Sequence, residues 1–263
     1  KWFSGMGQEA ISVGVTHALK ESEYILPMHR NLGVFTSRNI PLNRLFAQWQ
    51  GKQSGFTQGR DRSFHFGTQE YKIVGMISHL GPQLGVADGI ALADMLRRKK
   101  RVTAVFTGEG ATSEGDFHEA LNWAARSKTP VLFLVEDNKW AISVHVSDQT
   151  AGGTAYKLAR GYEGLKRARL DGTDFFQSYA VAKAALEDAR AQYQLETVLL
   201  DHHVLKAPYD AIVVERHKEL GSVLAPGEAL FTLVAPETVW ALAYVDEARA
   251  GGIRVGQPAE VRL

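Results

Sequence analysis

A carboxylate and an amide stand at the ends of two apolar runs that the sequence predicts to be neighbouring strands. Gly108-Glu109-Gly110 follows the run from Val102 to Thr107, and Asp137-Asn138 follows the run from Val131 to Val135. The carboxyl ends of parallel strands meet along one edge of a sheet, where α/β proteins bind ligands. Carboxylate and amide oxygens suit Mg²⁺, which completes its shell with phosphate and water. The flanking glycines would let a diphosphate approach the backbone near a helix amino terminus.

Gly108-Glu109-Gly110 alone also fits an ordinary glycine turn, so the Mg²⁺–diphosphate hypothesis depends on the elements around it. Those elements alternate between helices and short apolar strands, which is typical of βαβ units with a buried parallel sheet. Helices are expected at Gly7–Lys20, Gly81–Leu96, Ser113–Arg126 and Tyr179–Ala191, and strands at Val102–Thr107, Val131–Val135 and Thr197–Leu200.

Three smaller features complete this part of the chain. Ser113 can cap its helix, with Asp116 at the spacing of a capping box. Tyr24–Pro41 is expected to be an irregular segment that leads into a further helix. Gly51–Gly75 has little periodicity and predicts a long loop, and loops of this length are often functional.

After Leu205 the pattern changes to short strand-like runs separated by Gly and Pro turns, which predicts an all-β tail. We therefore expect two domains, residues 1–205 and 206–263. Within the tail, strands are expected at Ala211–Val214, Leu230–Val234, Val239–Val245 and Ala259–Leu263.

Composition excludes several classes of function. The 263 residues are 45% hydrophobic and 22% charged, as in proteins with a real core. The net charge of +1 gives no reason to expect nucleic acid, and the cationic run Arg97–Arg101 fits a solvated helix end better than a ligand patch. The absence of cysteine excludes disulfides and thiolate metal sites. No apolar stretch approaches the roughly 20 residues that span a bilayer, so we expect no membrane insertion and a cytoplasmic protein.

A longer match makes the Mg²⁺–diphosphate hypothesis specific. The segments Gly108–Asp116, Glu119–Asn122, Asp137-Asn138 and Ala141–Ser143 closely resemble the thiamine diphosphate motif of 2-oxo-acid dehydrogenase alpha subunits. The resemblance runs from the first residue to about Val204. It implies an α/β thiamine-diphosphate-binding fold with a parallel sheet flanked by helices. Further matches are Gly7–Ala10, His29-Arg30-Asn31, Gly51-Lys52, Ser63–His65 and Ser78–Gln83.

The resemblance assigns roles position by position. Glu109, Asn138 and the backbone carbonyl of Trp140 would be the Mg²⁺ ligands. Ser78 and Leu80 would hold the aminopyrimidine ring of the cofactor, largely through backbone groups. The residues that would surround the diphosphate are His29, where the family usually has Tyr, together with Arg30, Gly108, Gly110 and Ala111.

His65 would lie near the substrate entrance, as a catalytic residue. From the residues alone, His65 could equally be a structural histidine, and His29-Arg30 could be a surface pair. The resemblance implies oxidative decarboxylation of a 2-oxo acid with transfer of the acyl group to a lipoyl group. It also implies two partners, a beta subunit that supplies the activating glutamate and a lipoyl-bearing acyltransferase. The chain alone is therefore expected to be inactive, and Glu109 does not decide which 2-oxo acid is the substrate.

Four departures from the family pattern stand against activity. Asp137 replaces the usual first Asn, and Lys139 fills a position that is often Gly. The family's earlier amino-terminal segment is not found, and neither is the His-containing loop expected after Val204.

The tail resembles a different family. Lys206–Ala211, Val213–Arg216, Gly221–Gly227 and Val255–Pro258 are similar to periplasmic adaptor (membrane fusion) proteins of efflux pumps, in a lipoyl-like half-sandwich and the start of a barrel. A generic β module is the alternative. No Asp-Lys-Ala hairpin is present, so no lipoate is expected. The second functional hypothesis is therefore a non-catalytic chimeric interaction protein, joined near Leu205.

Overall fold

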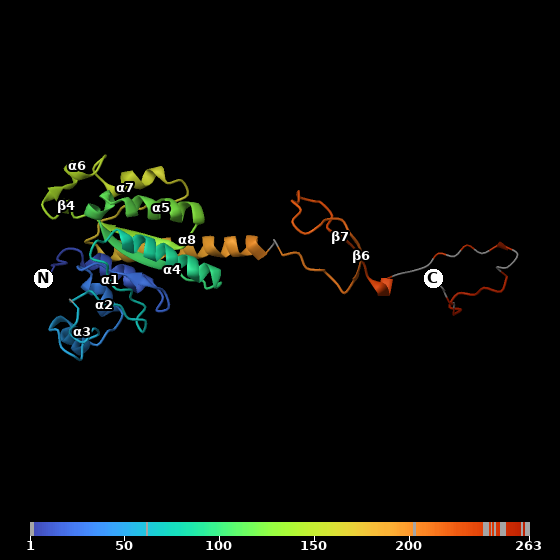
Figure 1. The fold of residues 1–263 in the computed structure, drawn as a ribbon, viewed down its shortest axis with the longest axis horizontal. Coiled ribbons are helices and arrows are strands. Elements are labelled where there is room, and N and C mark those ends of the chain that lie inside the picture. The colour runs from blue at the N-terminus through green and yellow to red at the C-terminus, as the bar shows by residue number, and fades with distance from the viewer. Residues whose placement is uncertain are drawn as a thin grey trace. The chain divides into compact units, whose positions relative to one another are not determined.

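The computed structural model divides the chain into two compact units, residues 1–202 and 203–263 (Figure 1). It describes residues 3–61, 63–201, 204–238, 242, 244, 246–247, 251–258 and 260. The first unit is a mixed α/β fold built on a parallel three-stranded sheet.

The sheet has the order β1-β2-β3, so that β2 (Thr103–Gly108) is flanked by β1 (Ile25–Leu26) and β3 (Val131–Glu136). Both pairings are parallel, and Gly108 at the end of β2 lies opposite Glu136 at the end of β3. The expected strands at 102–107 and 131–135 are therefore confirmed within one residue. β1 lies in the segment expected to be irregular, because two residues are too few to show an alternating pattern.

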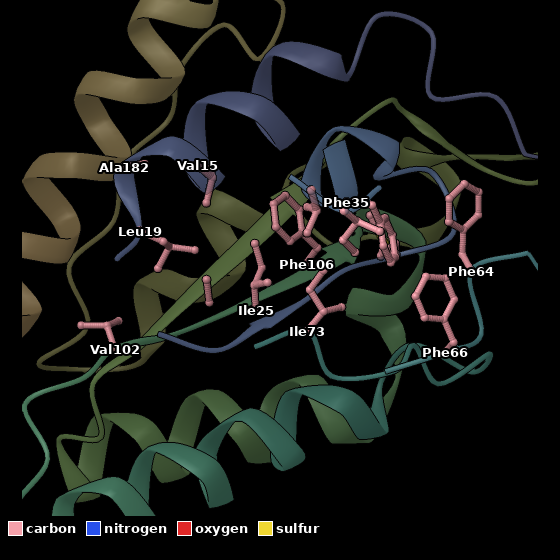
Figure 2. Close-up of a cluster of buried hydrophobic side chains, with 14 of the residues drawn as sticks. Val15, Leu19, Ile25, Phe35, Phe64, Phe66, Ile73, Val102, Phe106 and Ala182 are labelled. Carbon is pink, nitrogen blue, oxygen red and sulfur yellow. The ribbon is translucent and has the colours of Figure 1, made fainter. Parts of the chain in front are cut away.

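Alternate side chains of β2 enter two separate cores. Ala104 and Phe106 belong to a cluster with residues of α1 (Glu9–Ala18), α2 (Leu32–Ser37), α3 (Leu42–Trp49) and α8 (Phe175–Asp201). Val105 belongs to a second cluster with α4 (Pro82–Leu96) and α5 (Gly115–Ser127). Figure 2 shows the first cluster, with α1 and α8 on one side of the sheet and α4 and α5 on the other. The helices thus cover both faces of the sheet.

Two expectations about helices are wrong. The run Thr197–Leu200, expected to be a strand, continues α8 to Asp201. A short apolar run fits either structure, and neither Gly nor Pro interrupts the sequence between Asp174 and Asp201. Ser113 does not cap α5. It ends the 3₁₀ helix η1 (Glu109–Ser113), and its hydroxyl accepts a hydrogen bond from Gln149 Nε2 instead.

The long loop expected at Gly51–Gly75 contains no helix or named strand among its described residues. Its β-bridges are isolated ones, which pair Ile73 with Ile25 and with Thr68. The cations Arg97 to Lys100 are exposed after the end of α4. The remaining short elements of the first unit are β4 (Trp140–Ala141), β5 (Val144–His145), α6 (Val146–Gln149), α7 (Ala155–Leu158) and η2 (Ala159–Gly161).

The second unit contains an antiparallel pair, β6 (Ile212–Arg216) and β7 (Phe231–Val234), with a bulge between Val213 and Glu215. The short helix η3 (Pro236–Thr238) follows. Every residue of β6 is exposed, so this pair buries little apolar surface. The strands expected at 239–245 and 259–263 lie largely outside the described residues. No helix in the described part of the chain has the length and apolar character needed to cross a membrane.

Candidate functional site

The candidate site lies where the three parallel strands end. Loop 27–31 follows β1, Glu109 begins η1 directly after β2, and residues 137–139 follow β3. Because β2 is the central strand, Glu109 stands between the other two strand ends. The fold therefore brings together the segments that carry the predicted diphosphate and metal residues.

Glu109 is a buried carboxylate, only 2% exposed. It accepts hydrogen bonds from its own backbone N–H and from that of Asn138. Its Oε1 atom is buried and has no partner among the described residues. Burial raises the pKa of Glu109, and the two backbone hydrogen bonds oppose this rise. A buried carboxylate oxygen without a partner is costly unless a cation or donor satisfies it, so Glu109 fits a metal ligand.

Asn138 lies beside Glu109 but is exposed. Its Oδ1 atom accepts a hydrogen bond of 2.9 Å from the backbone N–H of Trp140, which fixes the amide and leaves a second lone pair. Its neighbours Asp137 and Lys139 form an ion pair, and Lys139 has a φ of 75°. The usual Gly would adopt this left-handed conformation without strain.

The predicted donor set would combine one carboxylate, one amide and one carbonyl. Within the described ranges, no three Asp, Glu or His side chains gather as a metal site. An oxygen set with few charges is nevertheless suited to Mg²⁺, because phosphate and water supply the remaining ligands.

The predicted small residues lie at the end of β2 and on η1. A Cβ atom at Gly110 would come within 2.8 Å of the Cβ atom of Ala141, so glycine allows β4 to pack against the turn. Gly108 has open space around the position of a Cβ atom. Ala111 is buried under the turn.

His29 and Arg30 lie in the loop after β1. Burial, together with the neighbouring Arg30 and His65, lowers the pKa of His29 to about 4, so its imidazole is neutral at neutral pH. Arg30 Nη1 donates to the carbonyl of Ser4 at 2.7 Å, and the guanidinium lies 5.6 Å from the ring centre of Phe3. Arg30 is therefore the charged group of this pair.

His65, in the long loop, meets Ser78 across 13 residues of sequence. Its Nε2 atom lies 2.7 Å from Ser78 Oγ, and its Nδ1 atom is buried without a partner among the described residues. Leu80 has a φ of 65°, an uncommon conformation for a residue with a side chain. Two of the predicted cofactor residues thus lie on one turn that also contacts His65.

Sequence reasoning assigned no role to three polar residues that organise this edge. Asn31 donates to Glu136 Oε1 at 2.6 Å and to Ser12 Oγ at 2.8 Å, which ties the loop after β1 to the end of β3. Burial raises the pKa of Glu136 to about 7. Gln149 contacts η1 from α6. Asn31 ends the matched segment His29-Arg30-Asn31, and Glu136 adjoins Asp137-Asn138, and these positions are the only signal that the sequence offers for them.

Comparison with known proteins agrees with this architecture. The family model described as "Dehydrogenase E1 component" matches residues 3–206. The 2-oxoisovalerate dehydrogenase subunit alpha of Dictyostelium discoideum is 38% identical over 185 residues, covering 70% of this chain and 42% of the relative. The 3-methyl-2-oxobutanoate dehydrogenase subunit alpha of Mycobacterium tuberculosis is 40% identical over 185 residues, covering 70% and 48%.

A third relative, the 2-oxoisovalerate dehydrogenase subunit alpha of Bacillus subtilis, is 38% identical over 193 residues, covering 71% of this chain and 57% of the relative. The chain thus spans about half the length of the curated relatives that it matches. The family model covers more than half of the chain, including all three strand ends. The chain therefore belongs to the dehydrogenase E1 component family.

Proposed function

We propose that this chain binds Mg²⁺ and thiamine diphosphate and forms the alpha-subunit half of a site that oxidatively decarboxylates a 2-oxo acid. The observation that carries the proposal is the buried Glu109 carboxylate, which accepts a hydrogen bond from the Asn138 backbone and has one oxygen without a partner among the described residues. Thiamine diphosphate, when bound, supplies the nucleophilic carbon and the electron sink that this decarboxylation needs.

Glu109, Asn138 and the backbone carbonyl of Trp140 are the proposed Mg²⁺ ligands. The free Oε1 atom of Glu109 would bind the ion, and the raised pKa of this carboxyl would fall when a cation arrives. Asn138 Oδ1 is already oriented by Trp140, so little side-chain entropy is lost on binding.

Arg30 and His29 are proposed to hold the diphosphate together with the backbone of Gly108, Gly110 and Ala111. Arg30 supplies the positive charge, and the neutral His29 supplies a hydrogen bond only. Ser78 and Leu80 are proposed to hold the aminopyrimidine. Leu80 has a left-handed backbone conformation, so the backbone groups of this turn can bind the ring instead of pairing within a regular helix.

His65 is proposed as the catalytic residue of this chain. The contact between Nε2 and Ser78 Oγ fixes the orientation of the ring, and Nδ1 has no partner among the described residues. A histidine held in this way can transfer a proton or orient the carboxylate of the substrate.

The partners are also proposals. A beta subunit would supply the glutamate that activates the cofactor, and a lipoyl-bearing acyltransferase would accept the acyl group. The names of the relatives specify 2-oxoisovalerate and 3-methyl-2-oxobutanoate, which favours a branched-chain 2-oxo acid as the substrate. Without the beta subunit we expect cofactor binding but no turnover.

A second candidate function concerns residues 206–263, proposed as a separate β domain similar to efflux adaptor proteins. The exposed apolar residues of the β6–β7 hairpin favour this candidate, since Ile212, Val213 and Val214 are all more than half exposed. A two-stranded hairpin is marginally stable alone, and its unpaired edges favour association. In this interpretation the chain is a non-catalytic interaction protein.

Calorimetric titration of thiamine diphosphate into the purified chain, with and without Mg²⁺, separates the two candidates. We expect Mg²⁺-dependent binding, weakened more than about 100-fold in Glu109→Ala, which exceeds the 10–100-fold typical of residues that only orient a metal ligand. Gln194→Ala, at an exposed position on α8, serves as the control. A folded chain that binds no thiamine diphosphate would contradict the first candidate and favour the second.

A further inference from the structure

Gln149, the last residue of α6, reaches η1 from 40 residues further along the chain. Its Nε2 atom lies 2.7 Å from the carbonyl oxygen of Gly110, 3.0 Å from Ser113 Oγ and 3.2 Å from the carbonyl oxygen of Glu109. One amide group thus holds both ends of the turn that carries Glu109.

The carbonyl of Glu109 is fixed twice. Thr112 Oγ1 donates to it at 2.7 Å from within η1, and Gln149 donates to it from outside. The second contact matters because a short 3₁₀ turn has weaker internal hydrogen bonds than an α-helix. Fixing the Glu109 carbonyl limits rotation of the residue whose carboxylate points at the proposed metal site.

The segment that ends at Gln149 also carries two of the three proposed metal ligands, Asn138 and Trp140. Asn138 precedes the β4–β5 hairpin, Trp140 is the first residue of β4, and the hairpin leads directly into α6 and Gln149. Ala141 of that hairpin packs against Gly110. The segment from Asn138 to Gln149 therefore begins at a proposed metal ligand and ends at a side chain that donates hydrogen bonds to the Glu109–Gly110 turn.

The chemistry of the contact requires an amide donor. Two of the three neighbours of Nε2 are carbonyl oxygens, which only accept hydrogen bonds. The Oε1 atom of Gln149 is buried and has no partner among the described residues, a cost that its other contacts offset. A carboxylate of the same shape would place negative charge against two carbonyls.

We propose that Gln149 is a positioning residue for the metal site: its amide fixes the Glu109–Gly110 turn so that Glu109 and Asn138 keep the separation that Mg²⁺ needs. This inference rests on the proposed function. It assigns no contact between Gln149 and the metal or the cofactor. Residues that orient metal ligands typically change metal affinity by about 10–100-fold when they are removed.

The test measures thiamine diphosphate affinity by calorimetry across a series of Mg²⁺ concentrations. The variants are Gln149→Ala and Gln149→Glu, with Gln194→Ala as the control. In Gln149→Ala we expect the Mg²⁺ concentration for half-maximal binding to rise by about 10–100-fold, with affinity recovering at saturating Mg²⁺. Gln149→Glu should show a larger rise, and the control none.

Two results would overturn the inference while the proposed function stands. Either Gln149→Ala keeps the Mg²⁺ dependence of the unsubstituted chain, or its loss of affinity persists undiminished at saturating Mg²⁺, as expected for general damage to the fold. Failure of the unsubstituted chain to bind at any Mg²⁺ concentration would overturn both proposals.

Discussion

At the scale of single residues, two buried carboxyl groups lie at the strand ends, Glu109 directly after β2 and Glu136 at the end of β3. Glu136 is 2% exposed and hydrogen-bonded to Asn31, yet one of its oxygens has no partner among the described residues. Arg30 and Asn31 favour its charged form but do not outweigh burial. Glu136 therefore stays protonated to a higher pH in the folded chain than in the unfolded chain.

The expected consequence is a pH-dependent stability difference for Glu136→Gln. The pKa of Glu136 in the folded chain is about 7, above the ordinary 4.5. The stabilisation that protonated Glu136 gives the folded chain is therefore fully present below pH 4.5 and is lost as the pH rises through 7. This displacement corresponds to about 3 kcal/mol. Glutamine resembles the protonated acid, so between pH 4.5 and pH 7.5 the variant should gain about 3 kcal/mol relative to the unsubstituted chain.

Urea denaturation at several pH values measures this difference. Taking the difference between the two proteins removes the titration of Asp88 and His29, which is common to both. A difference that stays constant across this pH range would show that Glu136 is ionised in the folded chain.

At the scale of elements, a largely buried ion pair attaches α8 to the segment that precedes β1. Arg190 Nε and Nη2 donate to the two oxygens of Glu23 at 2.9 and 2.5 Å, and Glu23 also accepts from the backbone N–H groups of Lys20 and Val102. Glu23 is fully buried. Removing Arg190 would leave this carboxylate without the cation that is hydrogen-bonded to both of its oxygens.

We expect Arg190→Ala to lower the free energy of unfolding by about 3–5 kcal/mol, the usual cost of removing one partner of a buried pair. Lys166→Ala is the matched control, since Lys166 also pairs with α8, through Asp188, but is exposed. The control should change stability by less than about 1 kcal/mol. Equal losses in the two variants, measured by urea denaturation, would contradict this account of α8.

The elements also show how far sequence reasoning reaches. The runs that form β2 and β3 are mostly apolar and are bounded by turns, so their position and parallel pairing could be predicted. α2 could not, because Gly33 and the β-branched Val34 and Thr36 disfavour an isolated helix, and packing of Phe35 into the core decides its structure. The carboxyl-terminal part of α8 carried an apolar pattern compatible with either helix or strand.

The candidate site was predictable where it depends on strand ends and not where it depends on side-chain contacts. Parallel pairing alone implies that Glu109 and Asn138 meet. The hydrogen bond between Asn31 and Glu136 joins residues 105 apart, and the contact between Gln149 and η1 joins residues 40 apart. Such contacts follow from the three-dimensional packing of loops, for which the sequence has no local pattern.

At the scale of the whole molecule, both hydrophobic clusters lie within residues 1–202. We therefore propose that residues 1–205 form an independent folding unit. A chain shortened to residues 1–205 should keep its cooperative thermal unfolding, with a midpoint within about 2 °C of the corresponding transition of the full chain. Calorimetry measures both transitions. Loss of cooperative unfolding in the shortened chain would show that the fold depends on the tail.

The central claim is that Glu109 and Asn138 together hold a divalent cation at the edge of the sheet. Electron paramagnetic resonance tests it directly, with Mn²⁺ in place of Mg²⁺, because the signal of free Mn²⁺ disappears when the ion binds. In the presence of thiamine diphosphate, we predict that the full chain binds a single Mn²⁺ and that Glu109→Gln and Asn138→Ala each abolish this binding. If both folded variants bind Mn²⁺ as well as the unsubstituted chain does, the cation is held elsewhere and the proposed site is wrong.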